Sequence, residues 1–383
     1  MNPIRVMVVD DSVVVRKIVT DVLSADPDIE VVGTAVNGKI AVAKLEQLKP
    51  DLVTMDIEMP EMNGIEAVRA IRAGEGGTAH GRVPIIMFST LSERGASATL
   101  DALSAGANEY VTKPANVGSV GQSMESVREQ LIPKIKALTG RPAGPGPARV
   151  AAPVAPVRPV PPRTGPRKKP AVLVIGASTG GPEALSRVLP LLPATLPVPV
   201  LLVQHMPPVF TRQFAQRLDR LSALRVVEAA DGSPLVPGTA HLAPGDHHLV
   251  VRASKGRDPQ TGLNQGPPEN FCRPAVDPLF RSVVTAYDGA VLAVVLTGMG
   301  SDGRNGAAEV RAGGGTVLVQ DQATSVVWGM PGAIVQAGLA DEILPLDRVP
   351  EAIMRHLAGA SPARSAAGFS PARPADILAG RAR

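Results

Sequence analysis

One stretch of this chain cannot pack into a folded core, and it separates the residues before it from those after it. Residues 141–170, RPAGPGPARVAAPVAPVRPVPPRTGPRKKP, contain ten prolines, seven Lys/Arg and no acidic residue. Such a composition favours extended polyproline conformations and acts as a semi-rigid spacer. We therefore expect two folded domains at 1–140 and 171–358, joined by a disordered linker at 141–170 and followed by a disordered tail at 359–383.

The positive charge of the chain is concentrated in those two segments. The formal net charge is +4, but the linker carries +7 and residues 361–383 carry +3, which leaves about −6 elsewhere. Acidic folded domains argue against nucleic acid as a partner. No apolar run approaches the roughly 20 residues of a membrane span, so we expect no membrane insertion. The single Cys272 suits a reducing compartment, and we expect a cytoplasmic protein.

Before the linker, short apolar runs alternate with amphipathic stretches. The runs are 4–9, 30–35, 51–56, 84–89 and 109–113. Apolar residues at helical spacing lie between them, for example in 13–24. Five strands separated by helices predict a doubly wound parallel sheet, in which ligands bind beyond the carboxyl ends of the strands.

Reactive side chains follow four of these five strands. Asp10 and Asp11 end the first strand, Asp56 the third, Ser89 the fourth and Lys113 the fifth. Three neighbouring carboxylates repel one another unless a hard cation lies among them, and oxygen ligands suit Mg²⁺. Each of these residues alone is typical of a surface loop. Gathered at one sheet edge, they predict a site for Mg²⁺ and a phosphoryl group.

The motifs VVDDS, MDIEMPEMNG, FST and VTKP resemble those of response-regulator receiver domains, in order and spacing, over about 1–120. The resemblance implies that Asp56 accepts phosphate from a partner histidine kinase, and that Asp10 and Asp11, with Asp56, hold Mg²⁺. It further implies a switch hydroxyl, a switch aromatic ring and a phosphate-binding lysine, which are Ser89, Tyr110 and Lys113.

After the linker, the stretch AVLVIGASTGGP at 171–182 predicts a buried strand, a tight turn and a helix that begins near Pro182. A dinucleotide-binding loop requires G-x-G-x-x-G and a P-loop requires a lysine, and this stretch has neither. The pattern G-x-S-x-G, which places a nucleophilic serine on a tight turn, fits at Ser178. From these residues alone, Ser178 is either a nucleophile or part of an anion-binding loop.

A serine nucleophile needs a base and an acid that orients it. His205 follows the apolar run 198–204, and Asp302 follows the run that begins at 290, so both lie past strand ends as Ser178 does. Cys272 has no such setting, and we expect an inert thiol. We expect three other histidines at the surface, namely His241, His247 and His248. No His or Cys pair has zinc-binding spacing, so we expect no metal or cofactor in this domain.

The motifs GASTGGP, QHMP, HLAPGDHHL, RPAVDPLF and LTGMGSDG resemble the catalytic domain of chemotaxis response-regulator protein-glutamate methylesterases, over about 171–357. With the receiver before it, the resemblance spans nearly the whole chain. It implies two doubly wound α/β domains, a flavodoxin-like receiver and a methylesterase domain. The implied activity is hydrolysis of glutamate methyl esters on chemoreceptor signalling helices, with glutamine deamidation as a second activity, in sensory adaptation.

By these motifs, Ser178 is the nucleophile, His205 the general base and Asp302 its orienting acid. The same resemblance gives Met299 a backbone N–H in the oxyanion hole and Arg273 a contact with substrate. It also leads us to expect that phosphorylation of Asp56 regulates the hydrolase.

Two other functions remain open from the sequence. One is a receiver that controls a module which binds a ligand or a protein without chemistry. The other is a related acyl hydrolase that acts in a signalling pathway outside chemotaxis.

Overall fold

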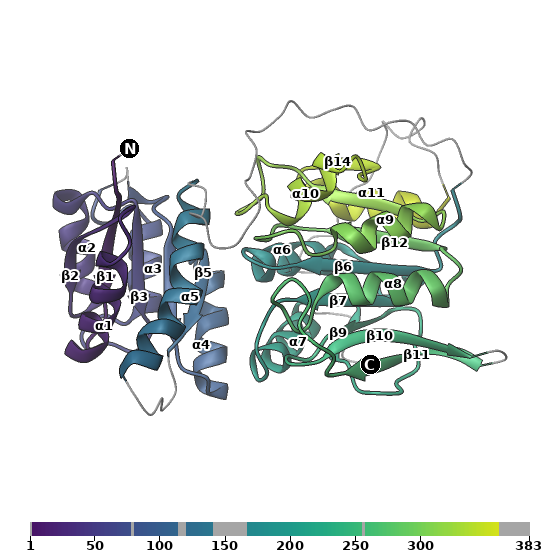
Figure 1. The fold of residues 1–383 in the computed structure, drawn as a ribbon, viewed down its shortest axis with the longest axis horizontal. Coiled ribbons are helices and arrows are strands. Elements are labelled where there is room, and N and C mark those ends of the chain that lie inside the picture. Colours follow the sequence, from purple (N-terminus) through teal and green to yellow (C-terminus); the bar gives the residue numbers. More distant parts are fainter. Residues whose placement is uncertain (1, 78–79, 114–119, 141–166, 255–256, 360–383) are drawn as a thin grey trace. The chain divides into compact units, whose positions relative to one another are not determined.

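The computed structural model describes residues 2–77, 80–113, 120–140, 167–254 and 257–359. They form two compact units, one before and one after residues 141–166 (Figure 1). Most of the predicted linker and tail lies outside the described residues, so their predicted disorder stays a prediction. None of the described helices combines the length and the hydropathy that crossing a membrane requires.

The first unit is a parallel sheet with helices on both faces. Its strands are β1 (Ile4–Val9), β2 (Ile29–Ala35), β3 (Leu52–Asp56), β4 (Ile85–Ser89) and β5 (Glu109–Thr112). Its helices are α1 (Val13–Ser24), α2 (Gly38–Leu48), α3 (Gly64–Arg72), α4 (Glu93–Ser104) and α5 (Val120–Leu138). Helices α1 and α5 pack together on one face, and α2, α3 and α4 pack in sequence on the other (Figure 1).

Successive side chains of a strand point to opposite faces of the sheet, and this places every second residue of β1 in one part of the core. Ile4, Val6 and Val8 are fully buried and point from β1 toward the apolar faces of α1 and α5. The strand order is β2-β1-β3-β4-β5, and every pair is parallel. The order changes direction between β1 and β3, which is where ligands bind in such sheets.

The second unit is a larger parallel sheet with an added hairpin. Its strands are β6 (Val172–Ala177), β7 (Val200–Gln204), β8 (Arg225–Glu228), β9 (Thr239–Leu242), β12 (Val291–Val295), β13 (Thr316–Gln320) and β14 (Glu342–Leu344). The antiparallel hairpin joins β10 (His248–Ser254) and β11 (Arg257–Asn264). Its helices are α6 (Gly181–Val188), α7 (Phe210–Leu221), α8 (Val276–Ala286), α9 (Arg304–Ala312), α10 (Met330–Gln336) and α11 (Val349–Leu357), with 3₁₀ turns at Leu189–Leu191 and Leu346–Arg348.

The strand order of this sheet determines which loops meet. The order is β14-β13-β12-β6-β7-β9-β8, so β6 lies between β7 and β12 (Figure 1). One face of the sheet packs against α8, α9 and α10 through aliphatic side chains. The predicted fold class, two doubly wound α/β domains, is confirmed. The sequence did not predict the hairpin, because PQTGLN in β11 lacks a strand pattern.

The end of the predicted linker contacts the second unit. Lys168 N–H donates a hydrogen bond of 3.1 Å to the carbonyl of Gly314, and Arg167 pairs with Asp341 at 3.4 Å. Pro170 is buried. These contacts anchor the chain where it enters β6.

Candidate functional sites

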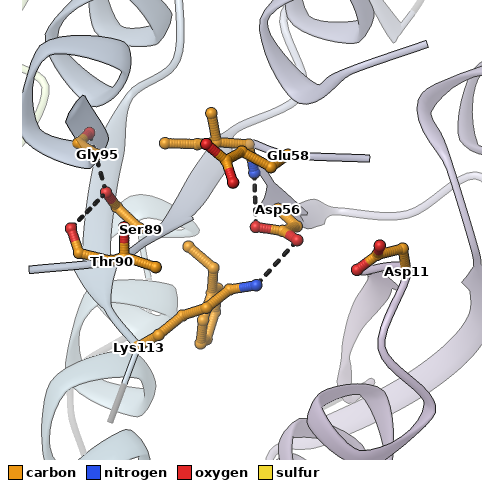
Figure 2. A pocket seen from close by; sticks show the side chains of 9 residues that line it. Asp11, Asp56, Glu58, Ser89, Thr90, Gly95 and Lys113 are labelled. Carbon is orange, nitrogen blue, oxygen red and sulfur yellow. Dashed lines mark hydrogen bonds and ion pairs between the residues drawn. The ribbon is translucent and has the colours of Figure 1, made fainter. Parts of the chain in front are cut away.

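The strand ends of the first unit bring the predicted phosphoryl-site residues together (Figure 2). Asp10 follows β1 and Asp56 ends β3, the adjacent strand. With Asp11, their carboxylate oxygens lie within 4.8 Å of one another. Asp11, Asp56, Ser89 and Lys113 line a pocket of about 280 Å³ at this edge. The pocket is therefore polar, and acids dominate its charge.

Lys113 connects two of the acids. Its Nζ lies 3.0 Å from Asp10 Oδ2 and 2.8 Å from Asp56 Oδ2, and the second pair is drawn in Figure 2. Burial, the largest effect, lowers the pKa of Lys113, but Asp56 and Asp10 together raise it above its ordinary value. One lysine balances one of three carboxylates, so the cluster retains negative charge that attracts a cation.

The surroundings of Asp56 raise the pKa of its carboxyl group. Burial, the largest effect, and the charge of Asp10 raise the pKa of Asp56 to about 6. Lys113 and the N–H of Ile57, which donates to Asp56 Oδ1 at 2.7 Å, act in the opposite direction. A cation among these acids would favour the carboxylate form, which is the form that can attack phosphorus.

The donor set fits Mg²⁺. All three candidate ligands are carboxylates, and hard divalent cations prefer oxygen ligands. Asp10 and Asp56 are buried while Asp11 is exposed, so an ion bound here would keep a side open to water or phosphate oxygens. The residues present therefore suit this ion.

The two predicted switch residues have different environments, and only Ser89 is among the residues that line the pocket. Ser89 Oγ accepts a hydrogen bond from Thr99 Oγ1 at 2.6 Å and donates to the carbonyl of Gly95 at 3.1 Å, so α4 holds it. Tyr110 is buried on β5, with Lys134 Nζ 5.2 Å from its ring centre. Burial raises the pKa of Tyr110 well above its ordinary range. Ser89 would have to give up its bond to Gly95 to donate a hydrogen bond to another acceptor.

In the second unit, Ser178 lies on the turn between β6 and α6. Gly181 N–H donates to the carbonyl of Ser178 at 2.7 Å, which closes the turn. Gly180 has a φ of 77°, and a Cβ added to it would lie 2.6 Å from Val326. Only glycine suits that position. Ser178 itself is partly exposed.

His205 and Asp302 follow the two strands that flank β6. The carboxyl ends of β7, β6 and β12 form one edge, where the strand order changes direction. His205 Nε2 lies 2.8 Å from Asp302 Oδ2. The backbone N–H of His205 donates to the carbonyl of Ala177 at 3.3 Å, which ties His205 to the residue before Ser178.

Asp302 is fully buried but well supplied with donors. Its carboxylate accepts five hydrogen bonds, from His205 Nε2, Val276 N, Asp277 N, Gly303 N and Asn270 Nδ2. Two of these donors are the first backbone N–H groups of α8, where the helix dipole favours a negative charge. Burial, the largest effect, raises the pKa of Asp302, but these bonds lower it below its ordinary value.

The pKa of His205 is raised, whereas that of Asp302 is lowered. Burial, the largest effect, lowers it, but the contacts with Asp302 and Cys272 raise the pKa of His205 to about 10. The imidazole is therefore protonated at neutral pH in this conformation. Among the described residues, no hydrogen bond joins Ser178 Oγ to either ring nitrogen. Such bonds often tighten only when substrate is bound.

Cys272 does not lie where the sequence suggested. Its Sγ is 3.4 Å from His205 Nδ1, the ring nitrogen opposite to the one that Asp302 holds. The prediction of an inert thiol rested on the absence of a strand before Cys272. A loop after β11 carries it to the strand-end edge instead, and no periodic pattern in the sequence marks such a loop.

The loop after β12 approaches Ser178 from the other side. A Cβ added to Gly298 would lie 2.9 Å from Ser178 Cβ, so the next residue, Met299, is close to Ser178. Within the part of the chain that the structure describes, the N–H groups of Met299 and Thr179 donate to no acceptor. Trp328 pairs with Gly298 through a backbone bridge and donates from its indole to the carbonyl of Gln320 at 3.0 Å.

Arg273 contacts protein groups. Its guanidinium bonds Asp246 Oδ1 at 2.9 and 2.5 Å and the carbonyls of Gln265 and Gly266 at 3.2 and 3.0 Å. These bonds hold the loop before Cys272. Contact with substrate stays a prediction for Arg273.

The surface positions predicted for three histidines are wrong for two of them. His241 on β9 is 3% exposed and His248 on β10 is 2% exposed, while His247 is partly exposed. His248 Nε2 bonds the carbonyl of Pro267 at 3.0 Å, and its Nδ1 accepts from Ala275 N at 3.2 Å. His241 and His248 are buried because each lies on a short strand, and the turn-rich sequence around these strands concealed them.

The sequence also left two supporting residues unnoticed. Gln204 is buried at the end of β7, and its amide donates to the carbonyl of Ser178 at 3.0 Å. Asn270 donates to Asp302 at 3.0 Å and to Asp277 at 3.2 Å. The one feature of the sequence that could have indicated a supporting residue is the position of Gln204 directly before His205.

Comparisons with known proteins cover both units. The family of the CheB methylesterase matches residues 173–353, and that of the response regulator receiver domain matches residues 6–124. A protein of Nocardioides sp. is 63% identical over 370 residues, which are 96% of this chain and 99% of that protein. A protein of Trichodesmium erythraeum is 47% identical over 366 residues, 93% of this chain and 100% of that protein. Both are named protein-glutamate methylesterase/protein-glutamine glutaminase.

Among solved structures, the CheB methylesterase catalytic domain of Thermotoga maritima is 44% identical. It covers 49% of this chain and 98% of its own, with a TM-score of 0.47.

Proposed function

Because the chain belongs to the protein-glutamate methylesterase/protein-glutamine glutaminase family, we propose that it hydrolyses methyl esters of glutamate side chains on chemoreceptors and deamidates glutamine side chains there. The reaction serves adaptation in chemotaxis, and its receiver places it under the control of a histidine kinase. The non-enzymatic module and the hydrolase outside chemotaxis are not favoured. The single cysteine supports a cytoplasmic location.

We assign the chemistry to three residues. Ser178 Oγ attacks the ester carbonyl carbon and His205 accepts its proton. The tetrahedral intermediate collapses when methanol leaves with that proton, and a glutamyl ester of Ser178 remains. Water, deprotonated by His205, then releases the carboxylate and restores Ser178. With a glutamine substrate, ammonia leaves in place of methanol.

The observation that carries this proposal is the bond of 2.8 Å between His205 Nε2 and Asp302 Oδ2, at the edge that also carries Ser178. Asp302 is ionised and orients the ring. Since Asp302 engages Nε2, Nδ1 is the nitrogen left to accept the proton. The N–H groups of Met299 and Thr179 are the candidate donors to the developing oxyanion.

In the receiver, Asp56 accepts the phosphoryl group from the kinase, and Lys113 contacts its oxygens. Asp10, Asp11 and Asp56 would hold Mg²⁺, which neutralises charge on the acids and the incoming phosphoryl group when it is bound. Ser89 turns from Gly95 toward the phosphoryl oxygens, and the buried Tyr110 completes the switch.

Replacement of the nucleophile tests the catalytic assignment. Ser178→Ala removes the attacking hydroxyl, so methanol release from a methylated receptor should fall by a factor on the order of 10⁶, the loss seen for a triad serine. Phosphorylation of Asp56 from a small phosphodonor in the same variant is the control for an intact receiver, and wild-type emission of Trp328 is the control for folding of the second unit. A variant that kept about a tenth of the normal rate would show that Ser178 is not the nucleophile.

Regulation is tested by comparing three forms of the protein on one methylated receptor. We expect the receiver to restrict access to Ser178, so that deletion of residues 1–140 and phosphorylation of Asp56 each raise the rate above that of the unphosphorylated chain. A coupling of about 1–3 kcal/mol corresponds to roughly 5–150-fold. Equal rates for the truncated and unphosphorylated forms would refute restriction and leave the receiver as a docking module.

A further inference from the structure

The proposed mechanism does not use Cys272, although a tight turn holds it against the general base. Glu269 and Cys272 exchange backbone hydrogen bonds of 3.1 and 2.9 Å. The two residues between them, Asn270 and Phe271, have φ values of 51° and 63°. Arg281 holds Glu269 with two further bonds, of 2.9 and 2.5 Å. The position of the sulfur is therefore set by the turn.

The sulfur completes a Cys–His–Asp arrangement. Cys272 Sγ lies 3.4 Å from His205 Nδ1, and Asp302 holds Nε2 at 2.8 Å. A thiol within hydrogen-bond reach of a histidine, itself oriented by a carboxylate, is the geometry of an activated thiol. Cysteines that contact a histidine and are partly accessible are the ones that react with small electrophiles. Cys272 is partly exposed, so small reagents have access to it.

The same contact occupies the nitrogen that the hydrolase needs. Asp302 engages Nε2, so a proton from Ser178 has to go to Nδ1, which faces the sulfur. A group attached to that sulfur would lie next to Nδ1 and crowd it. Chemistry at Cys272 and chemistry at Ser178 therefore compete for His205.

We propose that Cys272 is a covalent modification site: its sulfur reacts with soft electrophiles and small disulfides, and the adduct blocks His205 and stops hydrolysis. With a small disulfide, the thiolate attacks one sulfur, the disulfide bond breaks, a mixed disulfide forms at Cys272 and the other half leaves as a thiolate. A reducing thiol reverses the step. The loss of hydrolysis rests on the proposed function, whereas the reactivity of the sulfur does not.

The reactivity is measured on the full-length protein with iodoacetamide, whose iodide leaves as the thioether forms. Cys272 is the only cysteine, so intact mass reports one adduct at one site. We expect alkylation at pH 7 about tenfold faster than that of free glutathione, because the imidazole of His205 lies against the sulfur. His205→Gln and Asp302→Asn should each slow it toward the glutathione rate. Ser178→Ala, which removes no hydrogen-bond partner of the sulfur among the described residues, should leave it unchanged.

The effect on hydrolysis is measured after treatment with glutathione disulfide and removal of the reagent. The wild-type protein should lose more than about nine-tenths of its methanol release and regain it in dithiothreitol. Cys272→Ser, treated identically, should keep the rate of its own untreated sample.

Two results would overturn the proposal. Alkylation no faster than that of glutathione, or insensitive to both His205→Gln and Asp302→Asn, would show that the sulfur is not activated. A complete adduct with normal hydrolysis would show that it does not block the base. An untreated protein without hydrolase activity would contradict the proposed function, and the alkylation rates would still decide the reactivity.

Discussion

His205 is held in its protonated form by two neighbours, and this sets a pH requirement for the reaction. Burial lowers its pKa, but Asp302 and Cys272 outweigh burial and bring the pKa to about 10. In the mechanism that we propose, His205 is the general base and has to be neutral to accept a proton. Activity is therefore expected to rise with pH up to the pKa of His205 and to level off above it.

Replacement of Cys272 should move that profile. Cys272→Ala removes one of the two groups that raise the pKa of His205, so the rise in kcat/KM should occur at lower pH than in the wild-type protein. The measurement is methanol release from a methylated receptor across the pH range, and Ser178→Ala supplies the correction for spontaneous ester hydrolysis. Coincident profiles for the two proteins would mean that the thiol does not act on the base.

At the scale of secondary structure, the strand–turn–helix unit of β6 and α6 depends on one backbone conformation. Gly180→Ala should destabilise the protein by about 2–4 kcal/mol, because alanine is strained at a φ of 77° and its Cβ would clash with Val326. Gly232→Ala is the matched control, since Gly232 has a φ of 73° and nothing within 4 Å of an added Cβ. It should cost only about 1–2 kcal/mol. Chemical unfolding monitors both variants, and equal losses would exclude the clash.

The strands and helices were easier to predict from the sequence than the contacts between residues that lie far apart in it. Buried apolar runs that end in a reactive residue revealed the strands before Ser178, His205 and Asp302, and parallel strands place their carboxyl ends at one edge. The helix predicted at 13–24 is the observed α1. The contact of Cys272 with His205 could not be predicted, because it depends on where the turn after β11 folds back. Such contacts arise from long-range packing, which leaves no local period in the sequence.

At the scale of the whole molecule, the two units place their chemistry at the same topological position but differ in their need for a cation. The first unit gathers three carboxylates and one lysine, so negative charge remains there. In the second unit, the positive charge of His205 is paired with the negative charge of Asp302. A chelator should therefore abolish phosphorylation of Asp56 from a small phosphodonor. In the same sample, methanol release by the unphosphorylated chain should be unchanged. Lost hydrolysis that returns with added divalent metal would reveal a metal site in the second unit.

The bridge between Trp328 and Gly298 also gives the molecule a natural optical probe. Trp328 is the only tryptophan of the chain, so excitation at the red edge of protein absorption reports on the second unit alone. Its indole is fixed to Gln320, and its backbone is fixed to the loop that carries Met299 toward Ser178. The emission of a single intrinsic fluorophore thus separates melting of the hydrolase from melting of the receiver. If the loop that carries Met299 moves when substrate binds, the same signal will report it, without any label attached to the protein.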